Sequence, residues 1–153
     1  MVRFKHRYFA IEIEIVNNKN KSLKPPALLN AIKKKIQQLY GDYGLAAASI
    51  GFLTKYYNSS TKIAFVRSRH GPHRFVLNAL PLINDIDNQT VKINIIYIGA
   101  TIKHCFINVR RYQQKKLEEV WGSLKTDQQR KEMLRHMDST ISVKDFNKQY
   151  VNK

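Results

Sequence analysis

The sequence predicts an α+β protein in which helices cover one face of an antiparallel sheet. Residues 8–16 and 91–97 alternate apolar and polar side chains, which is typical of half-buried strands. Residues 28–39 instead repeat apolar side chains at helical spacing. Two further β-rich runs, joined by a short polar loop, lie between these segments. This mixture of periods favours strands and helices that share one core.

The first strand and the first helix follow from the spacing of their apolar residues. In the strand these occupy every second position, at Phe9, Ile11, Ile13 and Ile15. In the helix they recur every three or four positions, at Leu28, Ile32, Ile36 and Leu39. Pro25 and Pro26 suit the first helical turn, because the N–H that proline lacks would have no partner there. Gly41 is expected to end this helix.

The middle of the chain predicts a hairpin and then a short buried helix. Residues 46–57 and 61–69 are rich in strand-forming residues, and Asn58-Ser59-Ser60 suits the loop between them. The apolar run 75–83 is long enough for a buried helix, which Pro81 should end or kink. The fourth strand completes the order β-α-β-β-α-β. This is the ferredoxin-like arrangement, which is also that of the RNA-recognition motif (RRM).

Additional helices are expected from about residue 105. An apolar stripe at helical spacing should pack on the open face of the sheet or on a partner, through Val109, Leu117, Val120, Trp121 and Leu124. Thr126 and Gln129 resemble a capping box that opens a short last helix. We therefore expect a single domain over residues 1–138 and a flexible polar tail over residues 139–153.

Charge narrows the class of partner. The chain has 27 Lys and Arg against 11 Asp and Glu, a formal charge of +16 and a pI near 10.1. A field of that sign attracts polyanions such as RNA. A membrane partner is disfavoured, because no predicted helix combines a wholly apolar face with a basic one in the manner of a surface anchor. The single cysteine, Cys105, excludes an internal disulfide and is expected to be a buried structural thiol.

No catalytic or metal-binding group is predicted for the protein itself. A metal-dependent nuclease usually needs several carboxylates that converge, and the acids here are scattered along the chain. Glu12 and Glu14 share one strand face, where pairing with Arg67 or Lys92 is expected. The His70-Gly-Pro-His73 spacing could hold a metal, but it lacks a second ligand pair. A solvated basic turn is therefore the favoured interpretation.

RNA binding has more positive support at the amino terminus. Cations there alternate with the aromatic side chains of Phe4 and Tyr8, which combines phosphate pairing with surfaces for base stacking. Further basic residues gain meaning only from their excess over acids. The candidate RNA-binding residues are Arg3, Lys5, His6, Arg7, Lys55, Arg67, Arg69 and Lys103.

The sheet itself is not expected to be a platform for bases. Ala64-Phe65-Val66 resembles the middle of the RRM signature, but Ile63 and Ser68 stand where aromatic residues are expected. If Ile63 and Phe65 face outward, they share that face with Glu12 and Glu14, and carboxylates repel phosphate. Base stacking on this sheet is therefore disfavoured.

Three segments of the chain resemble a known family. MVRFKHRY (residues 1–8), SIGFLTKYYNSSTKIAFVRSRH (residues 49–70) and GATIKHC (residues 99–105) look like the Pop-five protein subunit family of eukaryotic ribonuclease P and ribonuclease MRP. The resemblance runs in order and spacing from residue 1 to about residue 124. Family members often end in an acidic tail, whereas this chain ends NKQYVNK. A function of such a tail is therefore not carried over.

This resemblance implies a non-catalytic role in an RNA enzyme. The expected partners are a large catalytic RNA, a TIM-barrel-like protein subunit and other protein subunits. The RNA and its bound Mg²⁺ would remove the 5′ leader of precursor tRNA or cleave precursor rRNA, and the protein would bind no cofactor. Its cations would reduce phosphate repulsion so that the RNA can compact. The resemblance further implies a nuclear and nucleolar protein.

Two alternatives belong to other classes. A structural protein of the ribosome or of another ribonucleoprotein explains charge and size, but not the three matching segments. A small metal-dependent nuclease of ferredoxin-like fold requires the carboxylate cluster that the sequence lacks. The identity of the RNA that co-purifies with the chain separates the first alternative from the favoured interpretation.

Overall fold

The computed structural model describes residues 4–16, 23–121, 128, 131–132 and 135. The chain divides into two compact units, Met1–Cys105 and Phe106–Lys153. The first unit contains the whole sheet and the first two helices, in the order that the sequence predicts. The elements are β1 (His6–Ile15), α1 (Pro25–Ser49), β2 (Leu53–Asn58), β3 (Ile63–Arg69), α2 (His73–Ala79), the 3₁₀ helix η1 (Leu80–Leu82), β4 (Asp85–Ile86), β5 (Gln89–Gly99) and α3 (Ile102–Trp121).

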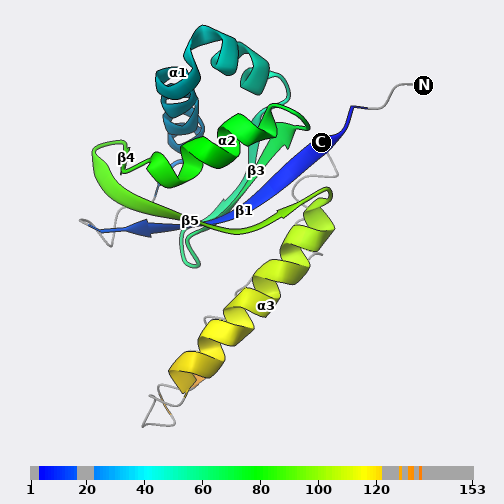
Figure 1. The fold of residues 1–153 in the computed structure, drawn as a ribbon. Helices are drawn as coiled ribbons and strands as arrows, with labels where there is room; N and C mark the ends of the chain where they lie inside the picture. Colours follow the sequence, from blue (N-terminus) through cyan, green and yellow to red (C-terminus); the bar gives the residue numbers. More distant parts are fainter. Residues whose placement is uncertain (1–3, 17–22, 122–127, 129–130, 133–134, 136–153) are drawn as a thin grey trace. The chain divides into compact units, whose positions relative to one another are not determined.

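The sheet is antiparallel, and its five strands lie in the order β2-β3-β1-β5-β4. Helices α1 and α2 cover the same face of this sheet (Figure 1). The core fills the space between the two layers and contains Phe9, Ile11 and Ile13 from β1 and Leu28, Ile32 and Ile36 from α1, all with no exposed area. Each fully buried side chain of this size contributes about 1.5–3 kcal/mol. The predicted α+β, ferredoxin-like class is confirmed.

Helix α1 is longer than the sequence analysis expected. Gly41 has φ 64° and ψ −162°, so it kinks the helix, but the helix resumes and ends only at Ser49. The expected stop at Gly41 is confirmed for the first helical segment, but the expected strand start at residue 46 is wrong, because a second helical segment follows the kink. Ala46, Ala47 and Ala48 explain the difference, because alanine has the highest helix propensity and Ala48 is buried in the core.

The connections carry the turn chemistry that their residues predict. In the β2–β3 loop, the Asn58 side-chain oxygen accepts hydrogen bonds from the Ser60 N–H at 2.8 Å and the Thr61 N–H at 3.4 Å. Helix α2 ends at Ala79, and Pro81 lies in the 3₁₀ helix that follows, which confirms that proline ends the helix. The segment expected only as a turn before the fourth strand contains a short extra strand, β4.

Helix α3 carries most of the predicted apolar stripe. Val109 is buried, Leu117 and Trp121 are half-buried, and Val120 is 38% exposed. What the stripe packs against stays a prediction, as does the extent of the single domain expected over residues 1–138. Leu124, the tail over residues 139–153 and most of the expected last helix lie outside the described residues.

Within the part of the chain that the structure describes, no helix is both long and apolar enough to cross a bilayer.

Candidate nucleic-acid interface

The pairing of β1 with β3 gathers basic residues at one end of the sheet. The strands are antiparallel, so the start of β1 meets the end of β3: His6 lies opposite Arg69, and Tyr8 lies opposite Arg67. The His70 N–H extends this pairing by donating to the Lys5 carbonyl oxygen at 2.8 Å. Cations some 60 positions apart in the sequence thus become neighbours. We call this region the cationic end; it comprises Lys5, His6, Arg7, Arg67, Arg69, His70, His73, Arg74 and Lys103.

The cationic end presents charge on both sides of the sheet. Side chains alternate along a strand, so Arg7 lies on the same side as the core residue Phe9, towards the start of α2. His6 lies on the opposite side with its register partner Arg69. There the Arg69 guanidinium carbon lies 4.6 Å from the centre of the Phe4 ring, and Phe4 is 63% exposed. This arrangement places a cation beside an accessible aromatic surface.

Burial and neighbouring cations lower the pKa of His6. Burial is the largest cause, and the charges of Arg67 and Arg69 add to it. A methyl group placed on Gly51 would lie 3.5 Å from His6 Nε2, so the ring sits against that turn. Arg67 Nε donates to the Gly51 carbonyl oxygen at 3.3 Å, which holds the guanidinium in the same place. An anion arriving here would relieve the repulsion among these cations.

The His70–His73 turn and the following Arg74 add two imidazoles and a guanidinium to the cationic end. The two imidazole rings stack with centroids 5.1 Å apart, and the Gly71 N–H donates to His73 Nδ1 at 3.1 Å. The pKa of His73 is lowered, mainly by burial and then by the charges of His70, Arg7 and Arg74. His73 and Arg7 are therefore close enough to interact, although they come from different elements.

The three remaining candidate residues, Lys103, Lys55 and Arg3, have different outcomes. Lys103 lies in the first turn of α3, directly after β5, whose last residue Gly99 is the register partner of Tyr8. The Cys105 thiol, 3.5 Å from the Tyr8 carbonyl oxygen, places this turn at the same end of the sheet. Lys55 lies in the edge strand β2, at the irregularity between Thr54 and Tyr56, and is not the register partner of a residue of the cationic end. Arg3 lies outside the described residues.

Sequence reasoning missed how His73 and Arg74 join this region. It treated residues 70–73 as an isolated basic turn. The signal was available, since a turn that follows directly after β3 must lie at the end of the sheet where β1 begins. Pairing the first and third strands of the predicted ferredoxin-like order would have brought this turn beside Arg7.

The acids of the sheet lie away from the cationic end. Glu14 is the register partner of Lys92, which confirms one of the two expected cross-strand neighbours. The expected pairing of these glutamates with Arg67 is wrong. Arg67 lies opposite Tyr8, four positions from Glu12 along β1, or about 13 Å at the rise of a strand. In the part that the structure describes, no three His, Cys, Asp or Glu side chains gather as a metal site.

The second face of the sheet is closed to bases at its centre. Phe65 and Ile63 are the register partners of Ala10 and Glu12, on the face opposite the core helices. The structure confirms that they share a face with Glu12, but Phe65 is 0% and Ile63 2% exposed. The Tyr56 ring packs against Phe65 with centroids 5.9 Å apart. Phe65 is therefore not accessible for stacking on a base.

Cys105 behaves as a structural thiol. It is fully buried, and burial raises its pKa to about 11, although a hydrogen bond with the Gly99 backbone acts in the opposite direction. At neutral pH the side chain stays protonated, and a protonated thiol is a poor nucleophile. The predicted buried thiol is confirmed.

Comparison with known proteins agrees with the resemblance seen in the three segments. Residues 7–110 match the model of the Rpp14/Pop5 family, which is more than half of the chain. The chain belongs to the Rpp14/Pop5 family. The matched region contains every strand of the sheet except the first residue of β1, and it includes Arg7, Arg67, Arg69 and Lys103.

Several curated relatives share the name ribonuclease P/MRP protein subunit POP5. The proteins of Bos taurus and Homo sapiens are each 33% identical over 122 residues, which is 76% of this chain and 72% and 75% of theirs. The probable POP5 subunit of Arabidopsis thaliana is 31% identical over 92% of this chain and 95% of its own length. A chain in a cryo-EM structure of yeast ribonuclease MRP superposes with a TM-score of 0.49 and 9% identity, covering 78% of this chain and 96% of that chain.

Proposed function

We propose that this chain is a non-catalytic, RNA-binding protein subunit of ribonuclease P and ribonuclease MRP, and that its cationic end contacts the RNA backbone. The names of the relatives support the assembly, and the charge of the cationic end supports the contact. One observation carries the second part. The segments that build this end, residues 5–7, 67–74 and 102–105, contain no Asp or Glu.

The cationic end suits phosphate better than base edges. Lys5, His70 and Arg74 are exposed, and the half-buried Arg7 and Arg69 have long side chains whose charged ends can reach solvent. Contacts of this kind position a protein on RNA without reading its sequence, and they release counterions. The exposed Phe4 ring beside Arg69 adds a surface on which one unpaired base can stack.

The chemistry belongs to the RNA in this proposal. Mg²⁺ bound to the RNA supports hydrolysis of the phosphodiester bond, at the 5′ leader of precursor tRNA or within precursor rRNA. This chain binds no cofactor, and its cations screen phosphate repulsion where RNA segments approach each other. A TIM-barrel-like subunit and further protein subunits complete the particle, which acts in the nucleus and nucleolus.

Sequencing the RNA that co-purifies with the tagged full-length chain tests the proposal. We expect enrichment of the ribonuclease P or MRP RNA over ribosomal RNA. Enrichment of ribosomal RNA alone would instead support the structural ribosomal alternative.

Purified chain incubated with precursor tRNA tests the non-catalytic role. We expect no cleavage of the leader, with or without Mg²⁺. Specific cleavage that disappears in the Glu12→Gln/Glu14→Gln variant would show that the protein is itself a nuclease.

A further inference from the structure

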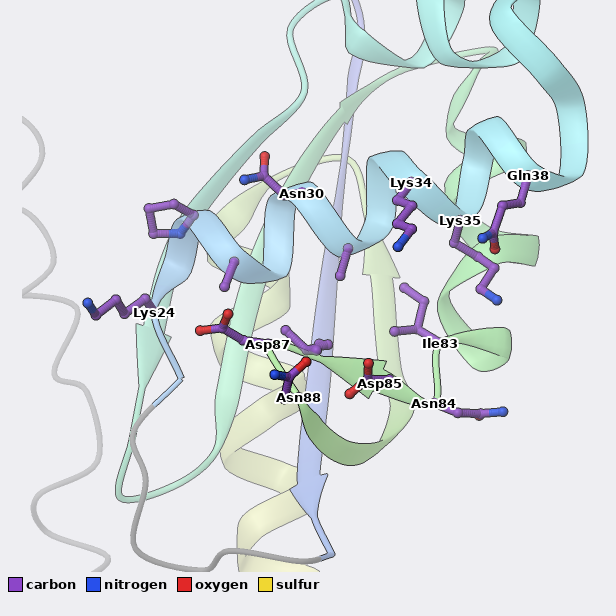
Figure 2. A pocket seen from close by; sticks show the side chains of 14 residues that line it. Lys24, Asn30, Lys34, Lys35, Gln38, Ile83, Asn84, Asp85, Asp87 and Asn88 are labelled. Carbon is purple, nitrogen blue, oxygen red and sulfur yellow. The ribbon is translucent and has the colours of Figure 1, made fainter.

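A groove lies between α1 and the β4–β5 turn, within the first unit. It encloses a cavity of about 590 Å³, which is within the range of about 300–1,000 Å³ typical of ligand sites. Lys34 and Lys35 line it from the helix, and Asp85 and Asp87 line it from the opposite wall (Figure 2). Carboxamides complete both walls, among them Asn30 on α1 and Asn88 on the turn. The groove therefore carries both signs of charge, one on each wall.

These opposite charges do not neutralise each other across the groove. Among the described residues, the side chains of Lys34, Lys35, Asp85 and Asp87 have no hydrogen bond or ion pair. Each wall is left with a charge that a bound molecule can pair.

The turn that carries the aspartates has a defined backbone. Asp87 and Asn88 have φ values of 55° and 62°, a left-handed conformation that these two residue types tolerate well. Ile86 and Gln89 flank the turn as register partners. In a hairpin with a two-residue turn this pair is hydrogen-bonded, so the N–H and C=O of the preceding Asp85 point away from β5. Because β4 is an edge strand, these groups can accept an added strand.

We propose that this groove binds an extended segment of a protein partner that carries both acidic and basic side chains. The backbone of the segment pairs with the β4 edge at Asp85, its acids pair with Lys34 and Lys35, and its bases pair with Asp85 and Asp87. Strand addition of this kind takes affinity from the backbone and specificity from the side chains. RNA is a poorer occupant, because two carboxylates on one wall repel phosphate.

Site-specific crosslinking in the assembled complex tests this inference. A photoreactive p-benzoylphenylalanine replaces Asn30 or Asn84, which line the groove from α1 and from the residues before β4, in the tagged full-length chain. Neither position has a positive φ, and the crosslinked products are identified by mass spectrometry. Ser59, exposed on the β2–β3 loop, is the control position. We expect both groove positions, but not the control, to crosslink to one protein segment that contains acidic and basic residues. Crosslinks to RNA, to a segment without both charges, or to nothing would overturn the proposal.

Charge variants then test the two walls with the crosslinked segment as a synthetic peptide. Lys34→Gln/Lys35→Gln and Asp85→Asn/Asp87→Asn should each weaken binding about fivefold, since exposed ion pairs contribute modestly. Asn at position 87 preserves the backbone, because it also tolerates positive φ. Arg110→Gln/Arg111→Gln, exposed on α3, should leave the affinity unchanged. Unchanged affinity in both groove variants would overturn the proposal.

The inference does not depend on the RNA contact proposed for the cationic end. If ribonuclease P or MRP RNA fails to co-purify while the groove still crosslinks to one mixed-charge segment, only the proposed function fails. The converse result overturns only the groove.

Discussion

The cationic end and the groove show how one basic chain can present two different kinds of charged surface. The cationic end comes from strand pairing and its segments contain no acid, so it suits a polyanion. The groove has lysines on a helix and aspartates on a turn, so it suits a partner of mixed charge. The net charge of +16 describes neither surface by itself. What each surface can bind depends on how the signs are placed.

The two surfaces also differ in what holds them. Residues of the cationic end are neighbours only while β1 and β3 stay paired, although they are distant in the sequence. The walls of the groove are a single helix and a tight hairpin, both local structures. Damage to the packing of β3 should therefore affect the cationic end first.

Removing a buried side chain from β3 should have the largest effect. Phe65 has no exposed area, so Phe65→Ala should lower the free energy of unfolding by about 3–5 kcal/mol. Urea denaturation followed by circular dichroism measures this loss. Tyr43→Ala, at a side chain that is 79% exposed, should change it by no more than about 0.5 kcal/mol. Similar losses in the two variants would mean that the Phe65 side chain does not pack in the interior of the protein.

Giving the cationic end the mixed charges of the groove should have the next largest effect. Lys5→Glu/Arg69→Glu should weaken RNA binding at least about tenfold, since hydrogen bonds to charged groups contribute about 1.5–3 kcal/mol each. Lys34→Glu/Lys35→Glu makes the same change in net charge within the groove. Filter binding to the catalytic RNA should show a much smaller loss for this second variant. Equal losses would mean that only net charge matters.

Much of this comparison could be predicted from the sequence. The apolar alternation of residues 9–15 and the ferredoxin-like order are local patterns, and both are confirmed. Residue types and charge excess also identified Lys5, Arg67 and Arg69 as candidates. The pairing of β1 with β3 brings these three residues to one end of the sheet. The predicted strand order implies this pairing, but the sequence analysis did not use it to place the residues together.

Other features depend on competing local preferences and on tertiary packing, which a local sequence pattern does not contain. Gly41 is a helix stop by residue type, yet the alanines at 46–48 and the burial of Ala48 favour a resumed helix. The groove requires that β4 exists, and a strand of two residues has no periodicity to detect. The orientation of Phe65, away from the core helices, was considered from the sequence, but its burial was not. Burial depends on what packs over the side chain, and a strand pattern does not contain this information.

The response to pH should separate stability from RNA binding at the cationic end. The folded state lowers the pKa of His6 and His73 below 6.5, so the unfolded chain binds protons first as pH falls. Stability from this source is therefore fully present above pH 6.5 and is lost as pH falls through the folded pKa values. RNA binding should change in the opposite direction, because phosphate favours the imidazolium form.

Calorimetric titrations with RNA between about pH 5.5 and 7.5 measure the number of protons that the complex takes up on binding. Proton uptake on binding should fall in His6→Gln/His73→Gln. Uptake that is the same in the variant would show that the RNA lies elsewhere.

The contact between Arg69 and Phe4 should give the smallest effect. An exposed cation–π pair contributes about 0.5–1 kcal/mol, so Phe4→Ala should lower the free energy of unfolding by no more than this. The same variant should weaken binding to single-stranded RNA more than binding to a duplex, because only an unpaired base can stack on the ring. Equal losses on the two RNAs would show that Phe4 supports the fold alone.

The salt dependence of RNA binding tests the role of the cationic end most directly. Each phosphate contact contributes about 0.7–0.9 to the slope of log affinity against log salt concentration. Lys5→Gln/Arg7→Gln/Arg69→Gln should therefore flatten the slope, measured with the catalytic RNA, by roughly two to three units. Lys33→Gln/Lys34→Gln/Lys35→Gln removes the same charge from α1 and should leave the slope unchanged. Equal slopes for the two variants would contradict a specific phosphate-binding role for the cationic end.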